Sequence, residues 1–394
     1  MKVAIITMSF PYDRETFAIN EFAYLKDYCD LEVHSLRPKH KIAEQLMQDY
    51  DMQNLKISHY SWRSLLRFVV YSIRYFSVLW YLLHGIFSIN FGKRSHLLKS
   101  LVFVPRIMEI FAHLKKNPPD VVHAYWCHFP ALLGFVCEKY LKNTQFTINY
   151  IAHDIYIGYN IAAYTKDVFG QHISICEENI PYMQSLGVKP ENIHVIYHGV
   201  PRKYLDYPLR SKQEFSILSV GSMIQRKSFD LVMEAYKKLK ENYPKATLTI
   251  GGDGPEHEYL SRRRAELDLE NEVRFTGYLM HDEVMRLMNE AEIFLLMSKN
   301  ERIANVTKEA MLMKCYCVAT KTPGVEELIT DGSNGFLIEI DDVDGAVRAI
   351  QMIWENRKTH DKVLSAARDT IDDKFILEKN IHKYIEIWTS MSSN

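Results

Sequence analysis

The second half of the chain alternates short β-branched runs with stretches of helical periodicity. Helix candidates between the runs include Asp230–Glu241, Glu256–Asp268, Asp282–Asn289 and Thr307–Met313. Strands that alternate with helices of roughly 10–15 residues predict βαβ units and a parallel sheet. The expected strands of this half are Phe215–Val220, Ala246–Ile250, Glu272–Thr276, Ile293–Leu296, Cys315–Ala319 and Phe336–Ile340.

The first half repeats this alternation, with a long helical block, 60–116, inserted in it. A turn-rich, proline-interrupted stretch at 198–208 separates the halves and is expected to be the linker. The pattern predicts an α/β protein with two Rossmann-like, doubly wound domains that face each other across a cleft, where ligands bind at the carboxyl ends of strands. Strands of the first half are expected at Val3–Thr7, Leu31–Ser35, Val121–Ala124, Phe146–Ile151, His172–Cys176 and His194–Tyr197.

The expected domain boundaries follow from the linker. An N-terminal domain spans 1–200 and includes the inserted helices, and a C-terminal domain spans 210–375. A last helix, 376–394, is expected to pack back on the N-terminal domain.

Composition excludes several classes of protein. Hydrophobic residues make up 47% of the 394 residues and charged residues 25%, which excludes a disordered chain, a collagen and a coiled coil. The six cysteines form no CxxC pair, so we expect buried thiols in a reducing, cytoplasmic compartment. The apolar run that follows Lys2 is four residues long, too short for a signal peptide.

The segment from Ser61 to Lys116 has a strong excess of positive over negative charge. It holds nine Lys and Arg residues against Glu109 alone, in a chain whose net charge is −1. Its longest run without Lys, Arg, Asp or Glu, 75–92, is shorter than the ~20 residues that span a bilayer. A basic, aromatic-rich amphipathic segment suits an anionic membrane surface. The alternative is a set of helices that pack on their own domain with basic outer faces; no motif indicates a nucleic-acid partner.

Two loops of the second half carry residues suited to a phosphate ligand. An expected strand ends at Gly221, and Arg226 and Lys227 follow just before a helix. Glycine lets backbone approach a ligand, and the two cations could neutralise a diphosphate, although such a pair is more often simply solvated. The glycine-rich turn 251–255 does not fit GxGxxG, and the first βα turn, 7–13, has no glycine, which disfavours a Rossmann dehydrogenase.

Glu301 and Glu309 stand eight residues apart around the expected start of a helix. The N–H groups near the start of that helix favour a phosphate, and a carboxylate on it can accept hydrogen bonds from a ribose diol. The alternative is two surface carboxylates without a ligand. The two glutamates follow the end of an expected strand in the same half of the chain as Gly221, and this position favours the binding interpretation.

Taken in order, these motifs resemble those of the retaining glycosyltransferases of family GT4, which have the GT-B fold. The resemblance covers nearly the whole chain and is strongest from Phe215 to Ile340. Further motifs that carry it are Val273–Gly277 and Pro323–Gly335. The N-terminal half is similar to the branch that builds exopolysaccharides, such as the colanic acid transferases, through Ser9–Pro11, Glu15–Phe17, Val122–Trp126 and Ala152–Asp154.

The resemblance implies a role for each site residue. Arg226 and Lys227, beside Gly221, would hold the donor diphosphate, Glu309 the ribose hydroxyls and Glu301 the transferred hexose. Backbone N–H groups of Asn305, Val306 and Thr307 would assist at the diphosphate. Backbone at Tyr278 and Leu279 would meet the base, and His153 the sugar near its primary hydroxyl; the alternative for His153 is a structural histidine.

The implied activity is transfer of a hexose from a nucleoside diphosphate sugar to a lipid-linked or polysaccharide acceptor, with retention of configuration. The enzyme would work in the cytoplasm as a peripheral protein on the inner face of the membrane, with no metal or other cofactor. Asp342 and Asp344 match DxD but are expected to cap a helix. The alternatives are a non-catalytic nucleotide-sugar-binding scaffold subunit and a GT-B-fold nucleotide-sugar epimerase.

The sequence departs from the family at three places. Arg302 replaces a usual glycine after the first glutamate, and would contact an acidic or modified sugar or point to solvent. Ser228 replaces the glycine that commonly follows the basic pair. The first βα turn carries Ser9–Pro11 where the family usually has glycines.

Overall fold

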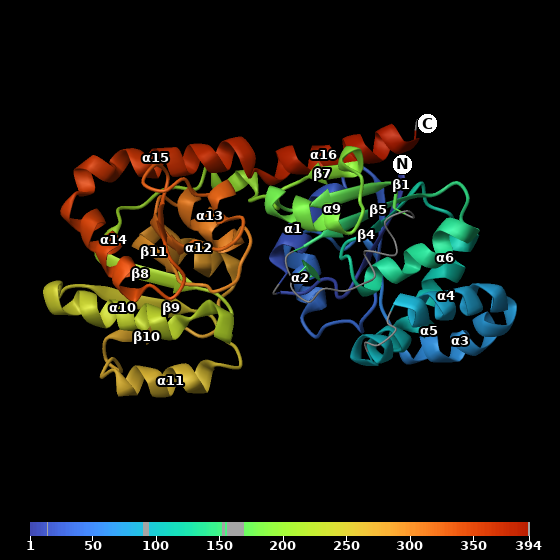
Figure 1. Cartoon of the computed structure of the whole chain (residues 1–394), viewed down its shortest axis with the longest axis horizontal. Coiled ribbons are helices and arrows are strands. Elements are labelled where there is room, and N and C mark those ends of the chain that lie inside the picture. Colours follow the sequence, from blue (N-terminus) through green and yellow to red (C-terminus); the bar gives the residue numbers. More distant parts are fainter. Residues whose placement is uncertain (14, 90–93, 152–153, 156–168, 393–394) are drawn as a thin grey trace. The chain divides into compact units, whose positions relative to one another are not determined.

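The computed structural model describes residues 1–13, 15–89, 94–151, 154–155 and 169–392 (Figure 1). The chain forms two compact units, each with its own parallel sheet and core. Unit 1 comprises Met1–His198 and Leu377–Asn394, and unit 2 comprises Gly199–Ile376.

The described residues of unit 1 form a seven-stranded sheet in the order β3-β2-β1-β4-β5-β6-β7, with every pairing parallel. Six of these strands overlap the expected ones, and the edge strand β3 was not predicted. Three residues, Lys-Ile-Ser, give no periodicity that sequence could reveal. The strands are β1 (Lys2–Thr7), β2 (Asp30–Ser35), β3 (Lys56–Ser58), β4 (Val121–Ala124), β5 (Gln145–Tyr150), β6 (Gln171–Ser174) and β7 (Ile193–Val195).

Helices cover this sheet, and the last of them comes from the C-terminus. In α16, Tyr384 accepts a hydrogen bond from Asn149 at 2.9 Å, and Trp388 donates to Thr147 at 3.2 Å. Both partners lie on β5, so the end of the chain is part of the unit 1 core. Apart from the inserted block, the described helices of unit 1 are α1 (Thr16–Leu25), α2 (Ala43–Asp49), η1 (Phe129–Ala131), α6 (Leu132–Tyr140), η2 (Glu177–Asn179), α9 (Ile180–Ser185), η3 (Pro190–Asn192) and α16 (Leu377–Ser392).

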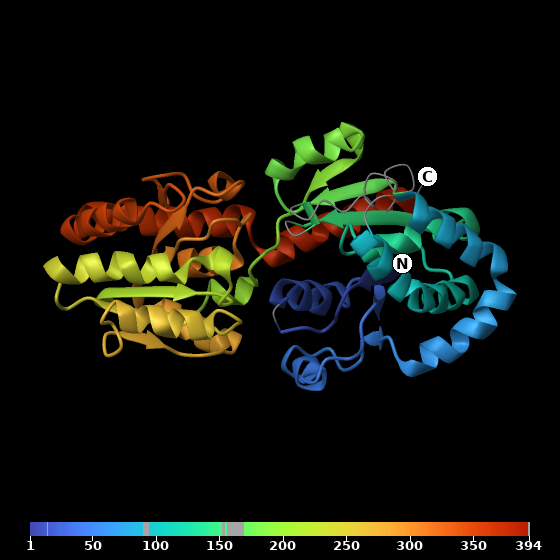
Figure 2. The same cartoon turned by 60° about the horizontal axis from the view of Figure 1, so that its bottom comes forward.

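The expected helical block is present as α3 (Trp62–Arg74), α4 (Phe76–Ile89) and α5 (Arg94–Lys116), shown in blue to teal in Figure 2. Helix α3 turns an apolar stripe toward solvent, and the one buried residue on it is Ser64. The exposed surface of α3 carries Arg63, Arg67 and Arg74 as well as this stripe, so it is both basic and apolar. More than half exposed are Trp62, Leu65, Leu66, Val69, Val70 and Ile73.

Among the described residues, no single helix is long and apolar enough to cross a membrane. Helices α3 and α4 meet that criterion only together, and they are bent by 106° at their junction.

Unit 2 contains a six-stranded sheet in the order β10-β9-β8-β11-β12-β13, again parallel throughout. Buried Ile217, Leu248, Ile293 and Val318 form its core together with apolar residues of the covering helices. Each of the six expected strands is present. They are β8 (Gln213–Val220), β9 (Thr247–Gly251), β10 (Val273–Phe275), β11 (Ala291–Leu296), β12 (Tyr316–Thr320) and β13 (Phe336–Ile338).

The strand order of unit 2 reverses between β8 and β11, because the chain winds first to one side of β8 and then to the other. In open sheets of this kind, ligands bind at the carboxyl ends of the strands beside such a switch point. The helices and turns of unit 2 are η4 (Arg202–Tyr204), η5 (Gln225–Lys227), α10 (Phe229–Asn242), α11 (His257–Glu266), α12 (His281–Glu290), α13 (Asn305–Leu312), η6 (Val325–Glu327), α14 (Val343–Glu355) and α15 (Arg357–Lys374).

Candidate functional site

The loops that follow β8 and β11 meet at the switch point of unit 2. Backbone N–H of Lys299 donates to the carbonyl of Arg226 at 2.8 Å, which joins the two loops directly. The side chains that sequence placed at both strand ends are thereby brought together.

Glu301 is the residue on which the basic pair converges. Lys227 Nζ lies 2.7 Å from Glu301 Oε1, and the Arg226 guanidinium contacts the same oxygen. Arg226 also donates to the Asn300 carbonyl at 2.9 Å. The basic pair is therefore not simply solvated: two cations expected at a diphosphate hold the carboxylate expected at the hexose.

Burial and charge act in opposite directions on this carboxylate. Burial favours the protonated form of Glu301, but Lys227 and Arg226 outweigh it and hold the pKa below its usual value. Glu301 is thus ionised at neutral pH. Gly221 gives Lys227 its room, because a Cβ there would lie 3.3 Å from Lys227 Cε.

The glycine-rich turn after β9 packs on the loop after β8. Gly252 has φ +130°, and a Cβ on it would lie 2.0 Å from the Gly221 carbonyl oxygen. A Cβ on Gly254 would lie 2.5 Å from the Met223 carbonyl oxygen. Only glycine fits these positions, so the glycines of this turn allow its backbone to pack directly against the backbone of the loop after β8.

The loop after β10 joins the same group of loops. Gly252 N–H donates to the Gly277 carbonyl at 2.9 Å. Leu279 packs over Gly251, where a Cβ would lie 2.9 Å from Leu279 Cδ1. Tyr278 is half exposed beside them. The backbone predicted to meet a base therefore lies in the same cluster of loops as Gly221.

Glu309 lies on α13, whose first turn contains Asn305, Val306 and Thr307. Its side chain is buried, so the alternative of two surface carboxylates is wrong. Glu309 Oε1 lies 3.0 Å from His281 Nε2, and His281 Nδ1 lies 2.9 Å from the hydroxyl of Tyr204.

The sequence analysis missed His281 and Tyr204. Burial acts to lower the pKa of His281, but the charge of Glu309 outweighs it and raises this pKa above its ordinary value. These two residues lie 28 and 105 positions before Glu309, and only the fold brings the three together.

The structure bears on two of the three departures from the family pattern, at Ser228 and at Arg302. Ser228 has φ +48°, in the left-handed region where glycine is favoured, and its buried hydroxyl has no hydrogen-bond partner among the described residues. Arg302 is only 9% exposed, so the alternative that it points to solvent is wrong.

The predicted capping role of the DxD pair is confirmed for Asp342, which accepts a 2.7 Å hydrogen bond from Gly345 N–H at the start of α14. Asp344 pairs with Lys238.

His153 lies outside the described residues. Its neighbour Asp154 is buried, accepts a hydrogen bond from Cys127 N–H at 3.1 Å and lies 3.1 Å from His128 Nδ1. Glu15, at the N-cap of α1, is a further acidic group of unit 1. The sequence analysis placed it in a motif but gave it no role. Burial raises its pKa to about 7, a shift that Arg37 opposes and Asp154 strengthens.

Comparison with known families agrees with this geometry. Residues 205–370 match the family described as glycosyl transferases group 1. This segment is a group 1 glycosyltransferase domain. It contains the basic pair, both glutamates and the loops that follow β8, β9, β10 and β11.

Some relatives of this domain are named for lipopolysaccharide or amylovoran biosynthesis. The chain is 27% identical over 192 residues to the lipopolysaccharide core biosynthesis glycosyltransferase LpsE of Rhizobium meliloti, which covers 49% of this chain and 54% of that protein. It is 29% identical to a Bacillus anthracis N-acetyl-α-D-glucosaminyl L-malate synthase over 46% of that protein. The chain thus spans about half the length of these relatives. With the amylovoran biosynthesis glycosyltransferase AmsK of Erwinia amylovora, the 26% identity extends over 95% of this chain and 96% of AmsK.

Solved structures share the fold of the whole chain. Anabaena HepE in complex with UDP superposes with a TM-score of 0.75 at 15% identity, over 99% of this chain and all of that one. The lipopolysaccharide outer core galactosyltransferase WaaB gives a TM-score of 0.69 at 17% identity, over 98% and 99%. The predicted fold class, GT-B with two Rossmann-like domains, is confirmed.

Proposed function

We propose that this chain is a glycosyltransferase that moves a hexose from a nucleoside diphosphate sugar to a lipid-linked or polysaccharide acceptor of a bacterial surface glycan. The observation that carries the proposal is the convergence of Arg226 and Lys227 on Glu301 at the switch point of a group 1 glycosyltransferase domain. HepE, which shares the fold, was solved with UDP-glucose.

The donor would rearrange the contacts of the site. A diphosphate carries more charge than a carboxylate, so it would take Lys227 and Arg226 as partners and release Glu301. The freed Glu301 could then accept hydrogen bonds from hydroxyls of the hexose. The first N–H groups of α13 would add their positive partial charge at the diphosphate.

These residues suit the chemistry of the step. As the sugar leaves the nucleotide, negative charge grows on the diphosphate, and fixed cations with a helix N-terminus stabilise that charge. The anomeric carbon becomes oxocarbenium-like. In the retaining mechanism proposed here, the acceptor hydroxyl attacks from the face of the leaving group, which takes up the proton. No protein nucleophile and no metal ion are assigned.

A turnover assay tests the proposal. The full chain is incubated with sugar nucleotides of UDP, GDP, ADP, CMP and TDP, and slow release of free sugar is followed without acceptor. We expect hydrolysis of one donor, which Lys227→Met lowers at least about tenfold because the leaving diphosphate loses a cation. Glu272→Gln, which breaks a remote pair with Lys240 in the same unit, serves as the control.

Other outcomes identify the alternatives. Nucleotide-sugar binding without any turnover indicates the non-catalytic scaffold subunit. Conversion of the sugar to an isomer, without acceptor, indicates the epimerase.

For the membrane partner, we propose that α3 docks the enzyme on an anionic bilayer at the inner face of the membrane. The solvent-facing stripe that contains Trp62, Leu66 and Val70 supplies the apolar contact. Exposed Arg63 and Arg74 flank it and supply attraction to anionic headgroups. A basic rim around an apolar stripe is complementary to such a surface.

Sedimentation with vesicles tests this docking. We expect the protein to pellet with phosphatidylglycerol–phosphatidylcholine vesicles, less with phosphatidylcholine alone, and hardly at all after Leu66→Glu with Val70→Glu. The control is Met352→Glu, at an exposed methionine of unit 2. Equal binding by the α3 variant, or self-association of the protein in place of vesicle binding, contradicts the proposal.

A further inference from the structure

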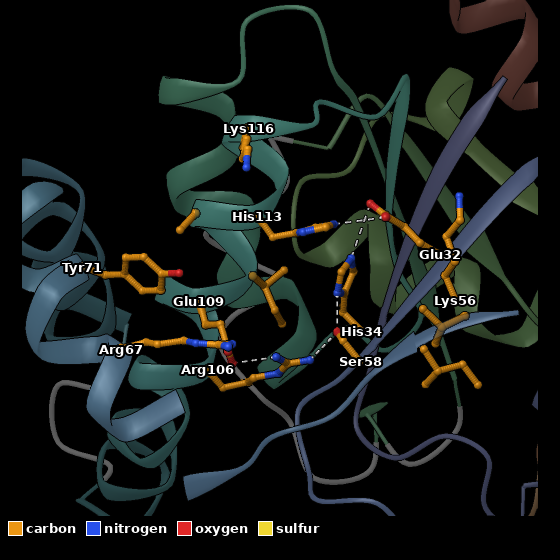
Figure 3. Close-up of a pocket in the computed structure, with 14 residues that line it drawn as sticks. Glu32, His34, Lys56, Ser58, Arg67, Tyr71, Arg106, Glu109, His113 and Lys116 are labelled. Carbon is orange, nitrogen blue, oxygen red and sulfur yellow. Dashed lines mark hydrogen bonds and ion pairs between the residues drawn. The ribbon is translucent and has the colours of Figure 1, made fainter. Parts of the chain in front are cut away.

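A separate cavity of about 410 Å³ lies in unit 1, between the β2–β3 edge of the sheet and helices α3 and α5 (Figure 3). Glu32 and His34 reach it from β2, where residues two apart point to the same face. His113 reaches it from the last turns of α5. None of these residues belongs to the donor site.

The three side chains bring nitrogen and oxygen ligands to one point. His113 Nε2 lies 3.2 Å from Glu32 Oε2, and His34 Nε2 lies 3.5 Å from Glu32 Oε1. One ligand atom from each residue lies within 4.8 Å of the others. Zinc ligands about 2.0–2.2 Å from a metal stand at comparable separations from one another.

Two of these atoms are buried and lack a hydrogen bond. Glu32 is 6% exposed and His34 is 4% exposed. Glu32 Oε1 and His34 Nε2 have no hydrogen-bond partner within the described parts of the chain. Lys2 Nζ lies 3.8 Å from Glu32 Oε1, beyond hydrogen-bond reach, and donates to the Asn117 carbonyl at 2.9 Å. Buried polar atoms left in this way are uncommon and call for a partner.

A chain of contacts fixes the orientation of His34, as the dashed lines of Figure 3 show. His34 Nδ1 lies 2.7 Å from Ser58 Oγ, which accepts a hydrogen bond from Arg106 at 2.6 Å. Arg106 in turn donates to Glu109 at 2.7 Å. In the tautomer that places the proton on Nδ1 beside Ser58 Oγ, the lone pair of Nε2 is left for a metal ion, as in metal-bound histidines.

We propose that Glu32, His34 and His113 bind a divalent cation of the zinc type, with the fourth coordination position open to the cavity. Two imidazoles and one carboxylate suit Zn²⁺, whereas Mg²⁺ and Ca²⁺ prefer oxygen ligands alone. Because His113 lies on α5 and the other ligands on β2, the ion joins the inserted helical block to the sheet.

Titration calorimetry with ZnCl₂ on chelator-treated, full-length protein tests the site. We expect one equivalent of Zn²⁺ to bind, no comparable binding of Mg²⁺, and visible absorption bands when Co²⁺ is used. His113→Ala should weaken binding more than tenfold, and its partly exposed side chain makes a folding defect a minor concern. Ser58→Ala should weaken it about tenfold by releasing His34.

His257→Ala, at an exposed histidine of unit 2, is the matched control and should bind like the wild type. Absence of Zn²⁺ binding overturns the proposal. So does unchanged affinity in His113→Ala, which would place the ion elsewhere. The result is independent of glycosyltransferase activity.

Discussion

Under the proposed function, Glu301 would compete with the donor diphosphate for the same two cations. Lys227 and Arg226 both contact its carboxylate, and both are assigned to the diphosphate. Removal of the negative charge in Glu301→Gln should therefore leave the cations more available to a free nucleotide. The same change should harm transfer, because the hexose loses a charged acceptor.

For Glu301→Gln we thus expect the affinity for the nucleoside diphosphate to stay equal or rise, while turnover of the sugar nucleotide falls about tenfold or more. Calorimetry measures the first quantity and the hydrolysis assay the second. Loss of nucleotide affinity in this variant would show that Glu301 does not oppose the diphosphate.

The backbone of Ser228 is strained because its φ is positive, and a glycine at this position would remove the strain. At φ +48°, a side chain costs about 1–2 kcal/mol, and the buried hydroxyl adds to this cost. Ser228→Gly should raise the free energy of unfolding of unit 2 by about 1 kcal/mol, after the entropy cost of glycine. Ser261→Gly, inside α11, should instead lower it by about 0.5–1 kcal/mol. Urea unfolding compares them, and a loss in both variants would contradict the strain argument.

The raised pKa of Glu15 predicts that the free energy of unfolding of unit 1 depends on pH. Its pKa is about 7 in the folded chain against 4.5 for the free side chain, so the unfolded state loses this proton first as pH rises. The contribution to the free energy of unfolding is therefore greatest below pH 4.5 and falls between pH 4.5 and about 7.

In Glu15→Gln this part of the pH dependence should vanish. Urea unfolding at pH 5 and pH 7.5 measures it in both proteins. An identical change of stability between the two pH values in wild type and variant would show that Glu15 titrates normally.

At the residue scale, the sequence named the candidate donor residues but not their contacts. Strand ends and helix starts placed Lys227, Glu301 and Glu309 on one sheet edge. The contacts of Glu309 with His281, and of His281 with Tyr204, depend on how distant loops pack. No local spacing encodes them.

Among the elements, the strands were predicted closely and the orientation of α3 was not. The spacing of Trp62, Leu65, Leu66 and Val69 indicates an amphipathic helix. Such a pattern places apolar residues on one face, but it does not say whether that face meets the core or the solvent. Here Ser64, bound to Glu109 at 2.6 Å, faces inward.

The cap of α14 gives a prediction at this scale. Asp342→Ala removes the acceptor for Gly345 N–H and should lower the free energy of unfolding of unit 2 by about 1 kcal/mol, whereas Asp342→Asn should retain most of it. Thermal unfolding with and without Mg²⁺ compares the variants. A Mg²⁺-dependent gain in stability, lost in Asp342→Asn, would contradict the capping role.

For the whole molecule, regular alternation predicts two doubly wound sheets because each β-branched run and helix repeats one folding unit. The inserted helices and the return of α16 to unit 1 interrupt that regularity. Buried Tyr384 and Trp388 show why the return is stable, since both rings lie in the core of unit 1. Unit 2 contains the described residues that are proposed to bind the donor, so donor binding should stabilise the folded chain against thermal unfolding.

A thermal-unfolding panel of UDP, GDP, ADP, CMP and TDP, with Glu272→Gln as control, tests the central claim most directly. A ligand that binds only the folded chain stabilises it by about 2.7 kcal/mol at ~100 times its Kd. The account predicts that one of these nucleotides raises the unfolding midpoint and that Glu309→Ala abolishes the shift. No shift with any nucleotide would contradict the assignment of Arg226, Lys227 and Glu309 to a sugar-nucleotide donor.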